Sequence, residues 1–205
     1  MVSIFTITFS QLVLFSGVVT AMDESVGRMI KALGQSSMLE NSIIVFISDN
    51  GAQTEGLLEN YGSNYPLRGV MKGYIWYFVF CRVSRYFDTY PNVFTIIYSN
   101  IYFQLKFTLF EGGIRGVACV YSRLIQNSSR ISNELMHITD WLPTFYSAAG
   151  GNLENLEENM DGVDQWDTIV SGRKSKRESV LLNIDEVEDV SSALIGKYKL
   201  ILNGN

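Results

Sequence analysis

The feature that most constrains the fold of this chain is an apolar run at residues 43–47, bounded by Ser42 and Ser48. The run is unbroken rather than alternating, which predicts a strand buried on both faces, as in a parallel sheet with helices on each side. Upstream, apolar residues recur at helical spacing with charged residues between them: Met22, Val26, Met29, Ile30 and Leu33. Thr20 with Asp23 is the expected cap of this helix, and Gly34 is its expected stop. A helix followed by a buried strand is typical of an α/β fold.

The same alternation continues downstream. Residues 114–121 predict another strand, and a helix over residues 141–149 begins after a cap at Thr139 or Asp140. Pro143 is tolerated in the first turn of that helix. Residues 180–184 and 197–202 are short strand candidates, which indicates a small antiparallel unit near the C-terminus.

Composition narrows the class of protein. The chain has 205 residues, of which 47% are hydrophobic, enough for one domain or a large piece of one. The formal net charge is −5 and the sixteen basic residues are dispersed, which argues against a nucleic-acid partner. The two cysteines, Cys81 and Cys119, form neither a disulfide framework nor a spaced metal site.

Residues 1–21 are apolar and end among small residues, which invites interpretation as a signal peptide. A signal peptide normally begins with basic residues, and no Lys or Arg precedes Arg28. Polar residues interrupt the run, so no transmembrane segment is expected there. The alternatives to a signal peptide are a buried strand and a sequence foreign to the mature protein.

Five phrases in this order resemble the later part of the type I sulfatases, closest to the arylsulfatase B branch. A helix (residues 15–27, FSGVVTAMDESVG) precedes a strand and turn (residues 44–51, IVFISDNG). Three further phrases follow: residues 66–69 (PLRG), 109–116 (LFEGGIRG) and 137–144 (HITDWLPT). Residues 161–166 (DGVDQW) continue the pattern. The resemblance covers residues 15–69 and 105–205.

The resemblance implies a fold and a division of the chain. The fold is an alkaline-phosphatase-like α/β/α sandwich that is partial, with its N-terminal strands missing, and the start of a small antiparallel C-terminal subdomain. Residues 1–14 are then an apolar leader outside the family sequence. Residues 15–152 are the C-terminal part of the catalytic domain, and residues 153–205 begin the C-terminal subdomain.

Residues 70–104 interrupt the family pattern with an aromatic-rich segment that has no sustained period. Joining Gly69 to Leu105 restores the phrase PLRG-LKFTLFEGGIRG. Val70-Met71 can be encoded by a GT-initial splice donor, and Phe103-Gln104 by an acceptor-like TTTCAG. We therefore predict that residues 70–104 are a translated, retained intron.

The resemblance also implies a chemistry, the hydrolysis of sulfate esters by a formylglycine held against a calcium ion. Asp49 and Asn50 match the family's metal ligands, and carboxylate and amide oxygens suit Ca²⁺. The alternative is an Asp-Asn-Gly turn that merely ends a strand. Lys106 matches a lysine that contacts the substrate sulfate, although it can equally be a solvated lysine. The resemblance implies sulfated glycosaminoglycans or sulfated sugars as substrates.

Other polar residues receive structural roles or none. His137, the one histidine, matches a structural position beside a helix cap. Glu111 and Arg115 are expected to form a structural ion pair or to orient the loop. The sequon at Asn127 predicts glycosylation and, with the family, a lysosomal or secreted protein.

The formylglycine cysteine has no counterpart in the chain. Residues 81–85 (CRVSR) approximate the family signature Cys-x-Pro-Ser-Arg, but Val83 replaces the proline and the segment follows the Asp-Asn-Gly turn instead of preceding it. We therefore expect this polypeptide to be an inactive fragment of a sulfuric ester hydrolase. The alternative is a non-catalytic sulfatase-like protein that binds sulfated sugars or a protein partner.

Overall fold

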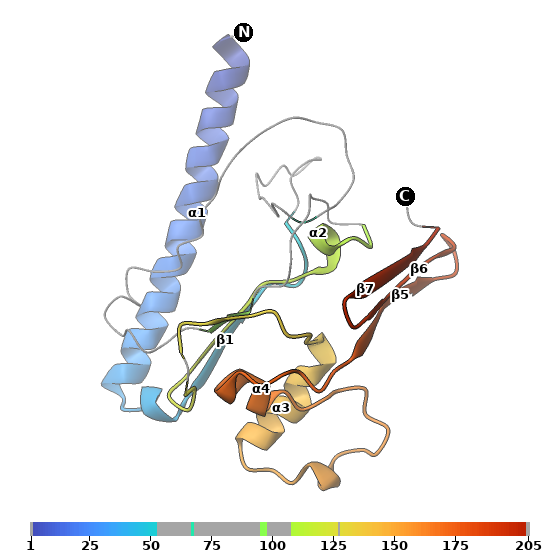
Figure 1. Ribbon diagram of the computed structural model, residues 1–205. Coiled ribbons are helices and arrows are strands. Elements are labelled where there is room, and N and C mark those ends of the chain that lie inside the picture. The colour runs from blue at the N-terminus through green and yellow to red at the C-terminus, as the bar shows by residue number, and fades with distance from the viewer. Residues whose placement is uncertain (1, 53–66, 68–94, 98–107, 127, 204–205) are drawn as a thin grey trace.

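The computed structural model describes residues 2–52, 67, 95–97, 108–126 and 128–203. Two sheets and several helices make up this part of the chain (Figure 1). The larger sheet has the strand order β1-β3-β2-β4, and the smaller one has the order β5-β6-β7. The strands of the larger sheet are β1 (Ile43–Ile47), β2 (Thr95–Ile97), β3 (Ala118–Ser122) and β4 (Ile131–Ser132).

Helices pack on both faces of the larger sheet. On one face, α1 (Val2–Gln35) contributes Ile30, which packs with Leu39 and Tyr121. On the other face, Val120 packs with Ile125 and with Ile169 of α4 (Trp166–Ser171). Trp141 of α3 (Trp141–Ala148) also packs against this second cluster. The predicted α/β/α layering is therefore present in the described residues.

The expected parallel pairing of the first strand is wrong. Ile43–Ile47 pairs antiparallel with β3, from Ile43 opposite Ser122 to Ile47 opposite Ala118. β1 also lies at the edge of its sheet, and Phe46 and Ile47 are each 40% exposed. An apolar run indicates that a strand can be buried on both faces, but it does not indicate whether the neighbouring strand is parallel or antiparallel.

The first helix is longer than the sequence predicts. It begins at Val2 and not at Thr20, whose hydroxyl donates to the Ser16 carbonyl one turn earlier. No proline interrupts residues 1–35, so nothing breaks the backbone hydrogen bonds at the expected cap. Gly34 lies inside the helix, and the left-handed residue after its end is Ser37, with φ of 55°.

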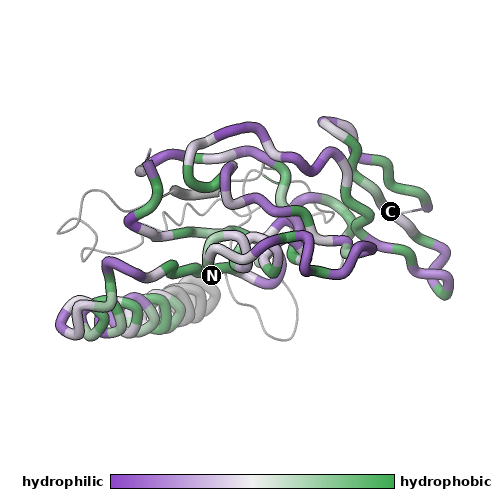
Figure 2. Tube along the Cα trace, turned by 90° about the horizontal axis from the view of Figure 1, so that it is seen from below, coloured by the Kyte–Doolittle hydropathy of each residue, from purple (hydrophilic) through white to green (hydrophobic). Residues whose placement is uncertain are grey.

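The expected core face of this helix is partly confirmed. Val26, Ile30 and Leu33 pack against the sheet, whereas Met22 and Met29 are exposed. Figure 2 shows hydrophobic and polar residues alternating along α1. Among the described residues, no helix is both long enough and apolar enough to cross a membrane.

The stretch predicted as the second strand, residues 114–121, begins with the last residue of a helical turn. α2 (Glu111–Ile114) takes the first residue of the stretch that was expected to be a strand, and β3 follows only at Ala118. The short 3-10 helices are η1 (Leu39–Asn41), η3 (Ile138–Asp140) and η4 (Leu153–Asn155). The predicted helix at residues 141–149 is confirmed as α3, one residue shorter.

The C-terminal unit is an antiparallel sheet of β5 (Ser179–Asp185), β6 (Val190–Ile195) and β7 (Tyr198–Leu202). The sequence predicts β5 and β7, and it misses β6 between them. β6 contains two serines in its first half, which weakens the apolar pattern of a strand.

Three residues of the aromatic-rich segment 70–104 take part in the larger sheet. Thr95–Ile97 pairs antiparallel with β3 and parallel with β4. The rest of that segment lies outside the described residues. Its origin as a retained intron concerns the message and stays a prediction.

Candidate functional site

The Asp49-Asn50-Gly51 turn directly follows β1, at the carboxyl end predicted from the sequence. The Asp49 side chain is exposed and its Oδ1 accepts a hydrogen bond from the Asn50 backbone N–H at 3.0 Å. Asn50 is half-buried, and its Nδ2 donates to the Gly51 carbonyl at 2.8 Å. This bond engages one N–H of the Asn50 side-chain amide.

The 111–117 segment holds this turn from the other side. The Ser48 N–H donates to the Val117 carbonyl at 2.9 Å, and the Val117 N–H donates to Ser48 Oγ at 2.8 Å. One step further, the Gly51 N–H donates to the Gly113 carbonyl at 3.0 Å. Any Cβ at Gly116 would lie 2.7 Å from the Ser48 carbonyl oxygen, so only glycine permits this approach.

Glu111 is the first residue of α2 and forms ion pairs with two basic side chains. Its Oε2 lies 3.4 Å from Nη1 of Arg115, which confirms the predicted ion pair. Its Oε1 lies 2.7 Å from Nζ of Lys199 on β7, a partner that the sequence analysis missed. Burial lowers the pKa of Arg115 to about 10, against the opposing effect of Glu111, so the guanidinium is still charged at neutral pH.

His137 has the structural position that the sequence predicts. It is the N-cap of η3, its Nδ1 lies 2.9 Å from Thr139 Oγ1, and its backbone N–H donates to Asp140 Oδ2 at 2.9 Å. Asp140 is fully buried. It completes a reciprocal cap, which explains why the helix that follows starts here.

The other predicted site residues lie outside the described residues. These are Lys106, the glycosylation candidate Asn127, and Cys81 with the segment around it. Their roles stay predictions. Cys119, the second cysteine, is buried on β3 at 5% exposure.

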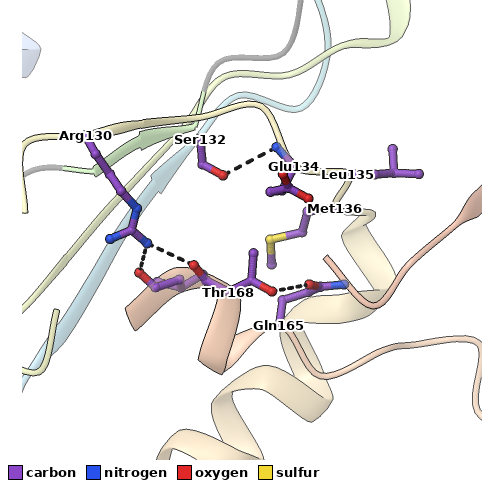
Figure 3. A pocket seen from close by; sticks show the side chains of 8 residues that line it. Arg130, Ser132, Glu134, Leu135, Met136, Gln165 and Thr168 are labelled. Atoms are coloured by element: carbon purple, nitrogen blue, oxygen red, sulfur yellow. Dashed lines mark hydrogen bonds between the residues drawn. The ribbon is translucent and has the colours of Figure 1, made fainter. Parts of the chain in front are cut away.

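A small cavity separates α4 from the chain around β4 (Figure 3). Its volume is about 10 Å³, which is room for one water molecule and not for a sugar. Gln165 and Thr168 line it from α4 and its cap, and Arg130, Ser132 and Glu134 line it from the opposite side. This cavity is therefore no candidate for a substrate site.

Asp49 and Asn50 carry the types of ligand atom that calcium prefers, but two residues supply only part of its coordination shell. A carboxylate and an amide oxygen are preferred donors, but Ca²⁺ takes about six to eight oxygens. Within the described part of the chain, no three His, Cys, Asp or Glu side chains gather at one point. The remaining ligands would have to come from elsewhere.

The sulfatase family matches the chain over residues 8–151. The chain belongs to the sulfatase family. Arylsulfatase J of Mus musculus is 34% identical over 174 residues, and arylsulfatase A of Homo sapiens is 26% identical over 181 residues. These alignments cover 84% and 87% of the chain.

Solved sulfatase structures share the fold. The structure of Ps i-CgsB in complex with k-i-k-neocarrahexaose matches with a TM-score of 0.58 at 19% identity, covering 91% of this chain and 35% of that one. The PsFucS1 sulfatase from Pseudoalteromonas sp. matches with a TM-score of 0.52 at 24% identity, covering 84% and 27%. The alkaline-phosphatase-like α/β/α fold expected for this sulfatase is thereby confirmed.

The chain spans only 22% of the length of arylsulfatase J and 28% of that of arylsulfatase A. Family membership and fold therefore apply to the residues that match. The assignment to the arylsulfatase B branch in particular stays a prediction.

Proposed function

We propose that this chain is part of a calcium-dependent sulfuric ester hydrolase that acts on sulfated glycans. The observation that carries the proposal is the Asp49-Asn50 pair at the carboxyl end of β1, fixed on both sides by backbone hydrogen bonds. Family membership supports the reaction class. The oligosaccharide in the complex of Ps i-CgsB supports the substrate class.

In this proposal the chain's own residues hold and orient the ion. Asp49 supplies a charged oxygen and Asn50 supplies a neutral one, since the Asn50 nitrogen is engaged by Gly51. When bound, calcium offsets negative charge on the sulfate group. Lys106 adds a second positive charge at the ester's sulfate oxygens, an effect of about 3–4 kcal/mol in comparable electrostatic sites.

The polypeptide as given does not hydrolyse sulfate esters under this proposal. Its 205 residues contain no Cys-x-Pro-Ser-Arg, and the formylglycine of the family is made from that cysteine. We also place the protein in the lysosomal or secreted class, with Asn127 glycosylated. Both assignments follow from the family resemblance and the sequon.

The metal-ligand assignment is tested by titrating the ¹⁵N-labelled chain with CaCl₂ and following its amide resonances. We expect the Asn50 and Gly51 amides to shift with half-saturation at or above about 1 mM, because two ligands bind Ca²⁺ weakly. Asp49→Asn abolishes the shift, whereas Glu188→Gln, which removes an exposed carboxylate in the turn between β5 and β6, leaves it unchanged. Equal shifts in wild type and Asp49→Asn would refute the assignment.

The second candidate function is a non-catalytic protein that binds sulfated sugars. An upstream gene sequence that lacks Cys-x-Pro-Ser-Arg would favour it. Amide shifts on adding a chondroitin sulfate oligosaccharide, with no turnover of a fluorogenic sulfate ester, support the binding protein. Turnover by this chain would contradict the proposed inactivity.

A further inference from the structure

Lys199 is a lysine on the inner face of a sheet whose outer face is apolar. Its neighbours on β7, Tyr198 and Leu200, are 72% and 58% exposed, whereas the Lys199 side chain is only 14% exposed. Burying an ammonium is costly unless it is paired. Its partner is Glu111, at 2.7 Å and 88 residues away in the sequence.

Glu111 is the first residue of α2, a helix of only four residues. A single helical turn is not stable by itself, because nucleation fixes several dihedral angles for one hydrogen bond. The position of α2 therefore depends on its tertiary contacts. Glu111 joins it to Lys199 on one side and to Arg115 at 3.4 Å on the other.

The opposite side of α2 reaches the candidate metal turn. The Gly113 carbonyl accepts the Gly51 N–H at 3.0 Å, one residue after Asn50. Gly112 and Gly113 are both buried. A displacement of α2 therefore lengthens or breaks the hydrogen bond from the Gly51 N–H to the Gly113 carbonyl.

We propose that Lys199 is a positioning residue that fixes the Asp49-Asn50 turn through Glu111 and the backbone of α2. The C-terminal sheet thereby sets the geometry of the two calcium ligands, a consequence that rests on the proposed function of that turn. Lys199 itself contacts no ligand in this arrangement. It acts through the chain of contacts Lys199, Glu111, Gly113 and Gly51.

The matched variants are Lys199→Met, Lys199→Arg and Lys197→Met, studied in the full chain. Lys197→Met removes the same charge from the same hairpin at an exposed position, where the ammonium lies 5.4 Å from the Tyr198 ring centre. Hydrogen exchange of single amides is read by NMR. In Lys199→Met, we expect the Gly51 amide to exchange about tenfold faster, because a partly buried charged contact is lost. Lys199→Arg restores protection, and Lys197→Met leaves it unchanged.

A general loosening of the C-terminal sheet is distinguished by the Gly196 amide, which bonds to the Glu178 carbonyl. Glu111→Gln breaks the same ion pair from the other side, together with the pair to Arg115, and should accelerate Gly51 exchange without affecting Gly196. Its effect should not add to that of Lys199→Met. Unchanged Gly51 exchange in Lys199→Met, or equal losses at Gly51 and Gly196 in both variants, overturns the positioning role.

The same samples are then titrated with CaCl₂. We expect half-saturation at a severalfold higher calcium concentration in Lys199→Met, and a return to the wild-type concentration in Lys199→Arg. If calcium shifts no amide of the wild-type turn while Lys199→Met still accelerates Gly51 exchange, the proposed metal function fails and the positioning contact stands. If wild type binds calcium and Lys199→Met binds it equally well, the positioning role in metal binding is refuted.

Discussion

At the scale of single residues, the side chain of Asp140 makes more hydrogen bonds than that of Asp49 or Asn50, the predicted metal ligands. Its carboxylate accepts from the backbone N–H groups of His137 and Val163, at 2.9 and 2.8 Å, and from Arg177 Nε at 2.8 Å. The Arg177 side chain is only 12% exposed, and Asp140 is not exposed at all. The pair joins the start of α3 to the irregular segment that leads into β5.

Asp140→Asn should lower the free energy of unfolding by about 3–5 kcal/mol, because it leaves the Arg177 charge buried without its counterion. The amide nitrogen of asparagine is a donor, and it would replace a carboxylate oxygen that accepts hydrogen bonds from N–H groups. Urea unfolding followed by circular dichroism measures the change. Asp161→Asn is the control, since Asp161 bonds Arg177 through its backbone carbonyl only, and it should unfold like wild type. A shift below about 1 kcal/mol for Asp140→Asn would contradict this role.

The sequence locates Asp49, Asn50 and the Glu111–Arg115 pair because each lies within a short phrase with a local geometry. It could not locate Lys199, whose partner is 88 residues away. One signal was available. The alternation of residues 198–202 places Lys199 on the same face as Ile201, where a lysine needs a counterion.

At the scale of elements, β7 has an inner and an outer face. Tyr198, Leu200 and Leu202 are exposed, and Lys199 and Ile201 are half-buried between them. Figure 2 shows hydrophobic residues along the strands of this C-terminal sheet. The exposed face also includes Leu181 and Ile195 of the neighbouring strands.

Leu200→Lys and Ile201→Lys should therefore differ although they are adjacent. Leu200→Lys changes stability by less than about 0.5 kcal/mol and lowers self-association, because it breaks an exposed apolar patch. Ile201→Lys destabilises the C-terminal sheet by about 1–3 kcal/mol, because it places an unpaired charge on the inner face. Light scattering and amide hydrogen exchange measure the two effects. Equal effects at both positions would show that the faces are assigned wrongly.

Element boundaries were predictable where a local signal ends them. α3 follows Asp140, one of the two expected cap residues, and the reciprocal cap of His137 and Asp140 starts the 3-10 helix η3 just before it. α1 does not begin at Thr20, because a potential N-cap residue does not start a helix when the residues upstream of it are themselves helical. The antiparallel direction of β1 could not be predicted, since it depends on a partner strand more than 70 residues downstream.

At the scale of the whole molecule, the larger sheet carries helices on both faces. The chain then passes through α3 and α4 and enters the smaller sheet (Figure 1). The layering was predictable from the helix-strand alternation. The order β1-β3-β2-β4 was not, because β2 lies in the segment 70–104, which has no periodic pattern.

Long-read sequencing of the transcript tests the origin of that segment. We expect mature message to join the codon of Gly69 directly to that of Leu105 and to continue upstream to a Cys-x-Pro-Ser-Arg segment. Reads across residues 60–70 that lack the predicted junction, with residues 70–104 in abundant mature message, would contradict the retained intron. In that case the strand at Thr95–Ile97 belongs to the protein that cells make.

The hydrogen bonds of Asp140 also imply an order of assembly. They span sequence separations of 3, 23 and 37 residues, to His137, Val163 and Arg177. Once Val163 is bound, the loop still to be closed shrinks from 37 to 14 residues, which lowers its entropic cost by about 0.9 kcal/mol. Each contact thus makes the next one easier, and this part of the chain can close progressively from the helix cap outward.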